Sequence, residues 1–135
     1  MKYNTNIILL GSLFAFLLLL YSCDSDNNGN SVTPPELSGE NLEFTQGRGT
    51  DVDITFDVEA EEGIQSLTLS VNGGTPEELS IETGAEMQSF THTFTIPAES
   101  VVGDEFNLLF TLTDQAEQEQ QVSALVTTGK LIEIP

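Results

Sequence analysis

Hydrophobic and polar residues alternate along most of the second half of the chain, which is the pattern of half-buried β-strands. Over residues 51–59, Val52, Ile54, Phe56 and Val58 alternate without a break with acidic or hydroxyl-bearing residues. Similar segments, bounded by turn residues, occur at 66–71, 89–96, 105–113 and 121–127. Weaker candidates lie at 42–44 and at 78–81, and we expect the second of these at the edge of a sheet. No segment has a convincing helical period. The sequence therefore predicts an all-β, antiparallel sandwich of about seven strands.

The N-terminus has a different pattern, an almost uninterrupted apolar run. Residues 7–21 are apolar or small apart from Ser12 and Tyr21, and they follow the basic residue Lys2. The run is shorter than the about 20 residues that a membrane-spanning helix needs. Its length and its basic start are typical of a secretory signal peptide. The alternative is an uncleaved N-terminal anchor helix.

The apolar run ends in Leu20-Tyr21-Ser22-Cys23, which contains the only cysteine of the chain. This sequence resembles the lipobox of bacterial lipoproteins, with an apolar residue at −3 and a small residue at −1. The resemblance implies that residues 1–22 are a lipoprotein signal peptide. It also implies that the sulfur of Cys23 takes a diacylglycerol, which anchors the mature chain to a membrane. Two or more acyl chains hold a protein on a bilayer stably, whereas one does not.

Residues 23–36 form a polar segment that we predict to be a lipidated, flexible tether ahead of a domain at 37–135. Its acidic start, at residues 24–28, resembles the export signal of Bacteroidota lipoproteins, which implies the outer face of the outer membrane. Under the enteric sorting rule, Asp24 would instead retain the protein in the inner membrane. The continued acidic run favours the outer membrane and the cell surface, with the periplasmic face as the alternative.

The charge of the chain is strongly negative, with 22 acidic residues against 3 basic ones. Lys2 precedes Cys23, so the mature chain would keep Arg48 and Lys130 alone as basic residues. Such a surface repels nucleic-acid phosphates and anionic lipids, which excludes nucleic-acid binding, and it favours cations and basic partners. With a single cysteine there is no disulfide and no cysteine-based zinc site, so we expect no cofactor apart from the calcium alternative below.

Two segments carry a resemblance to a known domain type. The run DEFNLLFTLTDQAEQEQQVSALVTT, residues 104–128, resembles the final hairpin of bacterial immunoglobulin-like and cadherin-like domains. The run SFTHTFTIPAESVVGDEF, residues 89–106, resembles the preceding part of such domains in small Bacteroidota lipoproteins. The inter-sheet cysteines, the core tryptophan, the tyrosine corner and the glycine of the last turn are missing. The resemblance implies an immunoglobulin-like architecture and no particular activity.

An acidic ladder is the most unusual feature of the predicted domain. Asp51, Asp53, Asp57 and Glu59 share the polar face of one strand, with neighbours about 6.6 to 7 Å apart along the strand. In an immunoglobulin topology this strand pairs with residues 89–96, whose outer face offers Thr91, Thr93 and Thr95. The ladder is either a docking face for a basic partner or a solvated anionic face that blocks sheet aggregation.

Calcium is a third interpretation of these carboxylates. Ca²⁺ takes six to eight converging oxygens, which a regular ladder does not supply. Only loop ends could bring acids together, such as Asp51 with Glu117, or Asp57 with Glu61 and Glu62. The sequence has no EF-hand loop.

Catalytic chemistry finds little support in the sequence. His92 is the only histidine and falls between Phe90 and Phe94 on the apolar face of its strand, which favours a structural histidine. No serine lies in a G-x-S-x-G elbow. After Cys23 the chain has no Trp or Tyr on which a sugar ring could stack. We therefore predict that the protein is not an enzyme.

The sequence as a whole favours a non-catalytic lipoprotein domain on the outer membrane or cell surface. It would act as a binding or spacer module within a surface assembly, held to the membrane through Cys23, with a surface protein or a glycan as its partner. The alternatives are a carbohydrate-binding accessory lipoprotein and a calcium-stabilised adhesion module.

Overall fold

A computed structural model describes residues 32–130 of the chain. The predictions for the signal peptide, for Cys23, for most of the tether and for residues 131–135 concern residues outside this part. Within the described range, no helix is long and apolar enough to cross a membrane.

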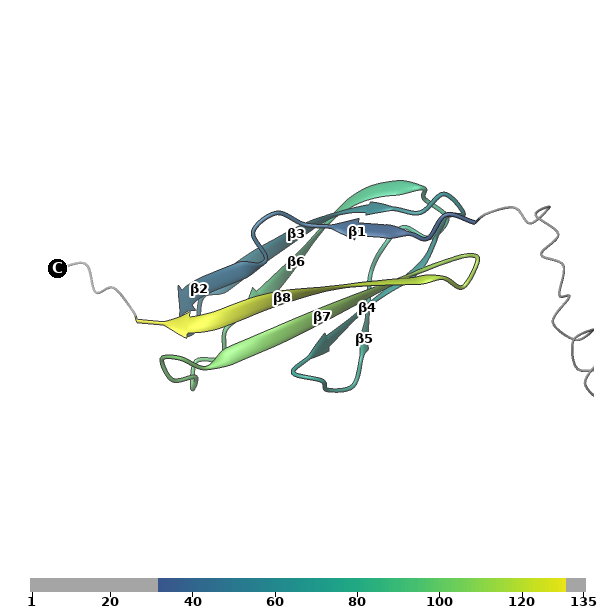
Figure 1. Cartoon of the computed structure of the whole chain (residues 1–135). Helices are drawn as coiled ribbons and strands as arrows, with labels where there is room; N and C mark the ends of the chain where they lie inside the picture. Colours follow the sequence, from purple (N-terminus) through teal and green to yellow (C-terminus); the bar gives the residue numbers. More distant parts are fainter. Residues whose placement is uncertain (1–31, 131–135) are drawn as a thin grey trace, which may run out of the picture. The chain divides into compact units, whose positions relative to one another are not determined.

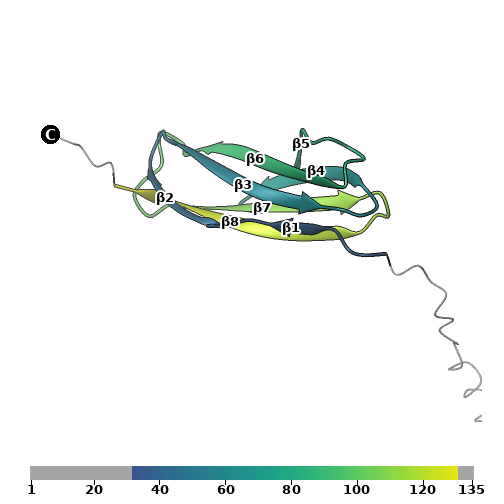
Figure 2. The same cartoon turned by 90° about the horizontal axis from the view of Figure 1, so that it is seen from above.

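Eight strands of the described part form two sheets that pack face to face (Figures 1 and 2). The smaller sheet has the order β1-β3-β6, with β1 at Glu36–Ser38, β3 at Asp51–Glu59 and β6 at Met87–Thr95. The larger sheet has the order β2-β8-β7-β4-β5, with β2 at Glu43–Gly47, β8 at Glu119–Gly129, β7 at Glu105–Asp114, β4 at Ile64–Val71 and β5 at Glu77–Leu79. The chain therefore folds as an all-β sandwich of the immunoglobulin-like kind, as the sequence predicted.

The alternation of β3 is the clearest link between sequence and fold. Its residues are alternately exposed and buried over the whole strand, and the predicted bounds of 51–59 are those of the structure. The weak candidate at 78–81 corresponds to β5. As expected for it, β5 is the last strand of the larger sheet. Period two identifies such strands because successive side chains of a strand point to opposite faces.

The N-terminal edge of the sandwich differs from the prediction. The sequence suggested one short strand at 42–44, whereas the structure has β1 before it and a longer β2. β1 pairs antiparallel with β3, but β2 pairs parallel with β8, so the expectation of purely antiparallel sheets is wrong at this edge. The chain changes sheets between Gly39 and Leu42, where Asn41 has a left-handed φ of 54°.

The glycine at this crossing lies close to the core. A Cβ on Gly39 would stand 2.8 Å from side-chain atoms of both Leu42 and Phe56. The connection therefore packs directly on the buried ring of Phe56, which only a residue without a side chain allows.

The core lies between the two sheets and is built from the apolar faces of β3, β4, β7 and β8. Its central contact joins Phe56 of β3 to Phe110 of β7, with ring centroids 4.6 Å apart. The wholly buried apolar residues are Ile54, Phe56, Ile64, Leu67, Ile96, Leu108, Phe110, Leu112, Ala124 and Val126. Hydrophobic burial of this one cluster is the main favourable contribution to folding, since the single cysteine provides no cross-link within the chain.

Candidate functional site

The acidic ladder is hydrogen-bonded to the neighbouring strand. β3 pairs with β6, and the hydroxyl of Thr95 donates to Oδ1 of Asp51 at 2.7 Å. The hydroxyl of Thr93 donates to Oδ1 of Asp53 at 2.6 Å. The first two carboxylates of β3 are thus matched by hydroxyl donors of β6 in place of basic side chains. This pairing was expected from the immunoglobulin topology, and it gives Asp51 and Asp53 a structural role in the sheet.

The other half of the ladder has no such donor. Asp57 stands between Ser38 of β1 and Ser89 of β6, and within residues 32–130 neither hydroxyl is hydrogen-bonded to it; Glu59 stands opposite Glu36 of β1. Like charges directly opposite each other in a sheet destabilise it. The outer face of the smaller sheet is therefore a surface of uncompensated negative charge.

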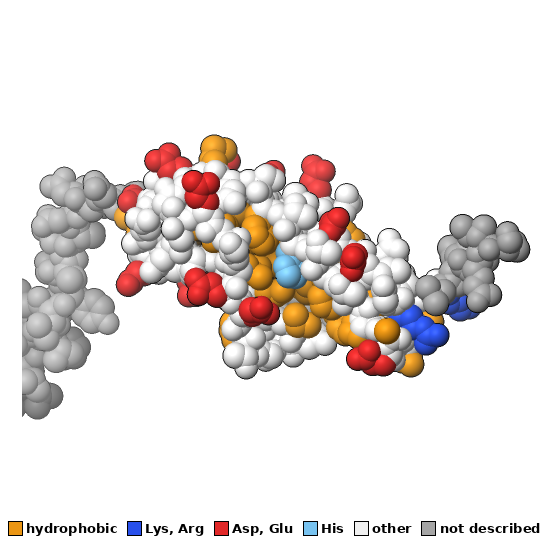
Figure 3. Space-filling model, turned by 180° about the vertical axis from the view of Figure 1, so that it is seen from behind, with side chains coloured by type: hydrophobic (Ala, Val, Ile, Leu, Met, Phe, Trp, Pro, Cys, Tyr) orange, Lys and Arg blue, Asp and Glu red, His pale blue; other side chains and the backbone are white. Residues whose placement is uncertain are grey.

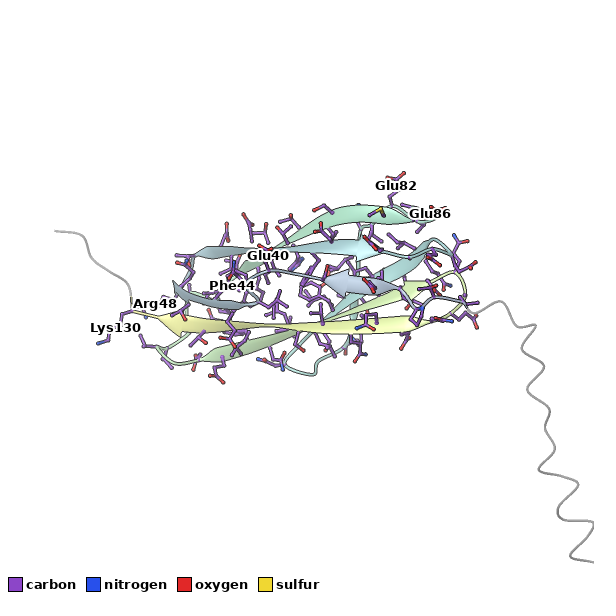
Figure 4. All side chains as sticks on the ribbon, turned by 45° about the horizontal axis from the view of Figure 1, so that its top comes forward. Glu40, Phe44, Arg48, Glu82, Glu86 and Lys130 are labelled. Carbon is purple, nitrogen blue, oxygen red and sulfur yellow. The ribbon has the colours of Figure 1, made fainter. Side chains whose placement is uncertain are left out.

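The basic residues of the described domain lie together at one end of it. Arg48 and Lys130 come together at the end of the sandwich where β8 ends, whereas Glu82 and Glu86 lie at the opposite end (Figure 4). The charge of the domain is therefore asymmetric, and a cationic partner would be drawn to the acidic side and not to this end.

The structure separates the acids proposed for one calcium site. Ile64 at the start of β4 pairs with Asp114, so the β7–β8 turn that carries Glu117 lies at the end of the sandwich where β3 finishes. Asp51 begins β3, about 26 Å away along the strand. Asp51 and Glu117 therefore cannot bind one ion.

The second proposed set of calcium ligands lies at a single end of the fold. Asp57 is near the end of β3, and Glu61 and Glu62 occupy the turn that follows. Within residues 32–130, however, no three acidic, histidine or cysteine side chains are placed to hold a metal ion together.

One side of the sandwich is open. The inward side chains of β3 are buried, whereas those of β6, which include Phe90, His92 and Phe94, are only half-buried. Figure 3 shows the consequence: the histidine lies within an apolar strip, with acidic side chains on both sides of it. The cause is the sheet order, because β6 is the last strand of the smaller sheet and the short β5 is the last strand of the larger one.

His92 and Glu77 occupy the mouth of this open side. The His92 ring meets Phe110 edge-on, with centroids 5.8 Å apart. Glu77 of β5 pairs with Leu69, whose side chain is buried, so the Glu77 carboxylate is on the inward face of its sheet. Burial lowers the pKa of His92 below its ordinary value of 6.5, and the charge of Glu77 partly opposes this shift. His92 is thus a neutral residue at the edge of the core, as the sequence indicated.

We expect His92 to make the domain less stable as the pH falls. Because its pKa is lowered by folding, the unfolded state binds more protons between that pKa and about 6.5. The contribution of His92 to the free energy of unfolding is therefore complete above pH 6.5, and it is lost as the pH falls through the pKa of His92 in the folded state. Urea unfolding of the native chain and of His92→Gln between pH 5 and 8 measures this effect. The difference between their free energies of unfolding is expected to become smaller as the pH falls. A difference that is constant with pH would contradict it.

Asp114 is the residue that sequence reasoning missed, since it appeared only as part of a turn. Its side chain is wholly buried, and Oδ1 accepts a hydrogen bond of 2.8 Å from the backbone N–H of Gln118. Oδ2 of Asp114 and Oε1 of Gln118 are buried without a hydrogen-bond partner. A Thr-Asp pair at the end of a strand is the only sequence signal at this position. The side chain closes the β7–β8 turn from inside.

The observed sheets define the class of protein: a small immunoglobulin-like β-sandwich domain with an acidic outer face and one open side. No family model and no curated protein matches the chain. Among solved structures, it is similar to the sporulation control protein Spo0M from Bacillus subtilis, with 15% identity and a TM-score of 0.51. That match covers 73% of this chain and 51% of Spo0M, so the chain spans about half the length of that protein.

A second similar structure is the PKD domain of an M14-like peptidase from Thermoplasmatales archaeon SCGC AB-540-F20. Its identity is 19% and its TM-score is 0.49, and the match covers 74% of this chain and all of that domain. At these identities, the similarity to Spo0M shows a shared fold and nothing further.

Proposed function

We propose that the protein is a lipid-anchored, non-catalytic binding module of the bacterial outer membrane. The observation that carries this proposal is the position of Cys23. The only cysteine of the chain closes a lipobox-like sequence, directly ahead of a polar segment and a single immunoglobulin-like sandwich. A lipidated cysteine followed by a spacer holds a small domain close to a membrane surface, where it can meet other surface molecules.

The surface of the domain favours binding over a purely spacing role. Asp57 and Glu59 present uncompensated charge on one face, and His92 and its aromatic neighbours are half-buried on the open side. A domain that only separates two others has no need of a half-open apolar edge, which exposes it to aggregation. The partner that this surface favours is a basic protein segment.

Replacing Cys23 tests the anchor. In a bacterium of the Bacteroidota, the native chain is expected to sediment with membranes and to incorporate an alkyne-labelled fatty acid. Cys23→Ala is expected to lose the label, to leave the membrane fraction at least tenfold depleted of mature protein, and to accumulate uncleaved precursor. Ser22→Ala is the matched control, since it keeps a small residue at −1, and it should behave like the native chain. Membrane association of Cys23→Ala as a processed chain would overturn the proposed anchor.

Labelling of intact cells tests which side of the membrane the domain faces. The mature chain has one lysine, so an impermeant carboxylate-coupling reagent suits it better than an amine-reactive one. Labelling in intact cells equal to that in lysed cells is expected for a surface domain. Labelling only after lysis would place the domain in the periplasm and contradict the cell-surface part of the proposal.

A further inference from the structure

The outer edge of β6 carries backbone groups that no strand of the described part pairs with. β6 has β3 as its one neighbour in the sheet. The carbonyl of Glu86 accepts a hydrogen bond from the N–H of Ala60. The N–H of Ile96 donates to the carbonyl of Thr50, and its carbonyl accepts from the N–H of Gly49. The backbone N–H and C=O groups of the even-numbered residues therefore point toward β3. The pairing of β3 with β6 is regular throughout. By alternation, the N–H and C=O groups of the odd-numbered residues Ser89, Thr91, Thr93 and Thr95 point to the free edge.

The side chains next to this edge are also incompletely covered. Phe94 packs on Phe106 with centroids 5.3 Å apart, yet both remain half-buried, as does Phe90. Across the opening, Glu77 places a carboxylate on the inward face of β5. One more strand beside β6 would cover these apolar side chains and bring its own inward residues toward Glu77 (Figure 3).

We propose that the free edge of β6 binds an extended, cationic segment of a partner protein, which adds a strand to the β1-β3-β6 sheet. The backbone of the segment pairs with the odd-numbered residues of β6, and its apolar side chains cover Phe90 and Phe94. A basic residue among its inward positions meets Glu77. The basic residues on its other face lie two strand spacings, about 10 Å, from the strand that carries Asp57 and Glu59, and the charge of these carboxylates attracts them.

Charge decides between a partner and a second copy of this chain. The chain has 22 acidic residues and 3 basic ones. Pairing two copies through β6 would bring two acidic faces and two Glu77 carboxylates together, which like-charge repulsion disfavours. The same negative charges attract a cationic segment, and they speed its association at low salt. This inference rests on the proposed function, because it names the partner class of the proposed binding module.

Peptide binding to the full mature chain in detergent tests the proposal. The probe is a nine-residue peptide with Lys at the odd positions and Val, Arg, Phe and Val at the even positions. A peptide of the same composition, permuted so that the alternation is lost, is the control. We expect saturable binding of the first peptide, at least tenfold tighter than that of the permuted one, which weakens as salt is raised.

Amide hydrogen exchange reports where the peptide binds. In the free chain, the amides of Thr91 and Thr93 should exchange fast, and those of Phe90 and His92 slowly, because only the latter face β3. Bound peptide should slow exchange at Thr91 and Thr93 at least tenfold. Unchanged exchange at these two amides in the presence of saturating peptide would overturn strand addition.

Two substitutions test the edge and the charge separately. Thr91→Pro removes one outward N–H, at a position where an edge strand tolerates proline, and should weaken binding at least tenfold. Glu77→Lys should weaken binding at least tenfold without touching the backbone. Glu43→Lys makes the same charge change on β2, at the opposite edge of the five-stranded sheet that also contains β5, and should alter the dissociation constant less than twofold. If Thr91→Pro does not fold, Glu77→Lys and the exchange experiment still decide the outcome.

Three results would overturn the inference. Equal effects of Glu77→Lys and Glu43→Lys would mean that the peptide binds by general charge attraction. Equal binding of both peptides would mean that no strand is formed. Dimerisation of the native chain that Thr91→Pro abolishes would mean that a second copy occupies the edge. None of these results bears on lipidation at Cys23, so failure of this inference is distinguishable from failure of the proposed anchor.

Discussion

Replacing Phe56 with alanine is expected to lower the free energy of unfolding by about 4 kcal/mol. The Phe56 side chain has 0% exposure, packs on Phe110 at 4.6 Å and lies under the backbone of Gly39. The substitution leaves a cavity between the two sheets, because the side chains around a wholly buried residue relax only in part. Because small domains are stable by only about 5 to 15 kcal/mol, much of the native stability would be lost. The midpoint and slope of urea unfolding measure the change.

Phe94→Ala is the matched control for this prediction. It removes the same side chain from the open side of the sandwich, where Phe94 is half-buried against Phe106. The expected loss is about 1 to 2 kcal/mol, since less apolar area leaves water on folding at this site. An equal loss for Phe56→Ala and Phe94→Ala would contradict the description of this side as open.

Replacing Asp114 with alanine is expected to cost about 2 kcal/mol of stability. The change removes the oxygen that accepts the N–H of Gln118 and leaves that donor without its partner inside the turn. A buried polar group without a hydrogen bond costs about 1 to 3 kcal/mol. Urea unfolding at pH 7 measures the loss.

Asp114→Asn separates the hydrogen bond from the charge. Asparagine keeps an oxygen for the N–H of Gln118, and its amide is a donor in a turn where Oε1 of Gln118 has no partner. It also removes a carboxylate that is wholly buried. We expect stability equal to or above that of the native chain. A loss as large as that of Asp114→Ala would show that the fold depends on the negative charge itself.

The strands of the sandwich could be predicted from the sequence because period two is a local property of an extended backbone. The side chains of β3 that face the core, for example, follow from its alternation alone. The edge position of β5 was also predictable, from its weak and acidic pattern. β1 was missed because a strand of three residues is too short to show a period.

The candidate site was predictable only in part. The acidic ladder and its threonine partners on β6 followed from the alternation and an assumed topology, and their hydrogen bonds have the predicted pairing. The burial of Asp114 and the approach of Glu77 to His92 were not predictable, because each depends on elements that are distant in the sequence.

The sequence by itself determined the longer strands, the apolar side chains of those strands that face the core, and the lipobox-like cysteine that precedes the domain. These features depend on neighbouring residues and on backbone geometry alone. Only the tertiary structure decided the crossing of the chain between sheets at Gly39, the parallel pairing of β2 with β8, and the open side next to β6. Sheet order and edges arise from pairings between residues far apart in the chain, which a local pattern does not specify.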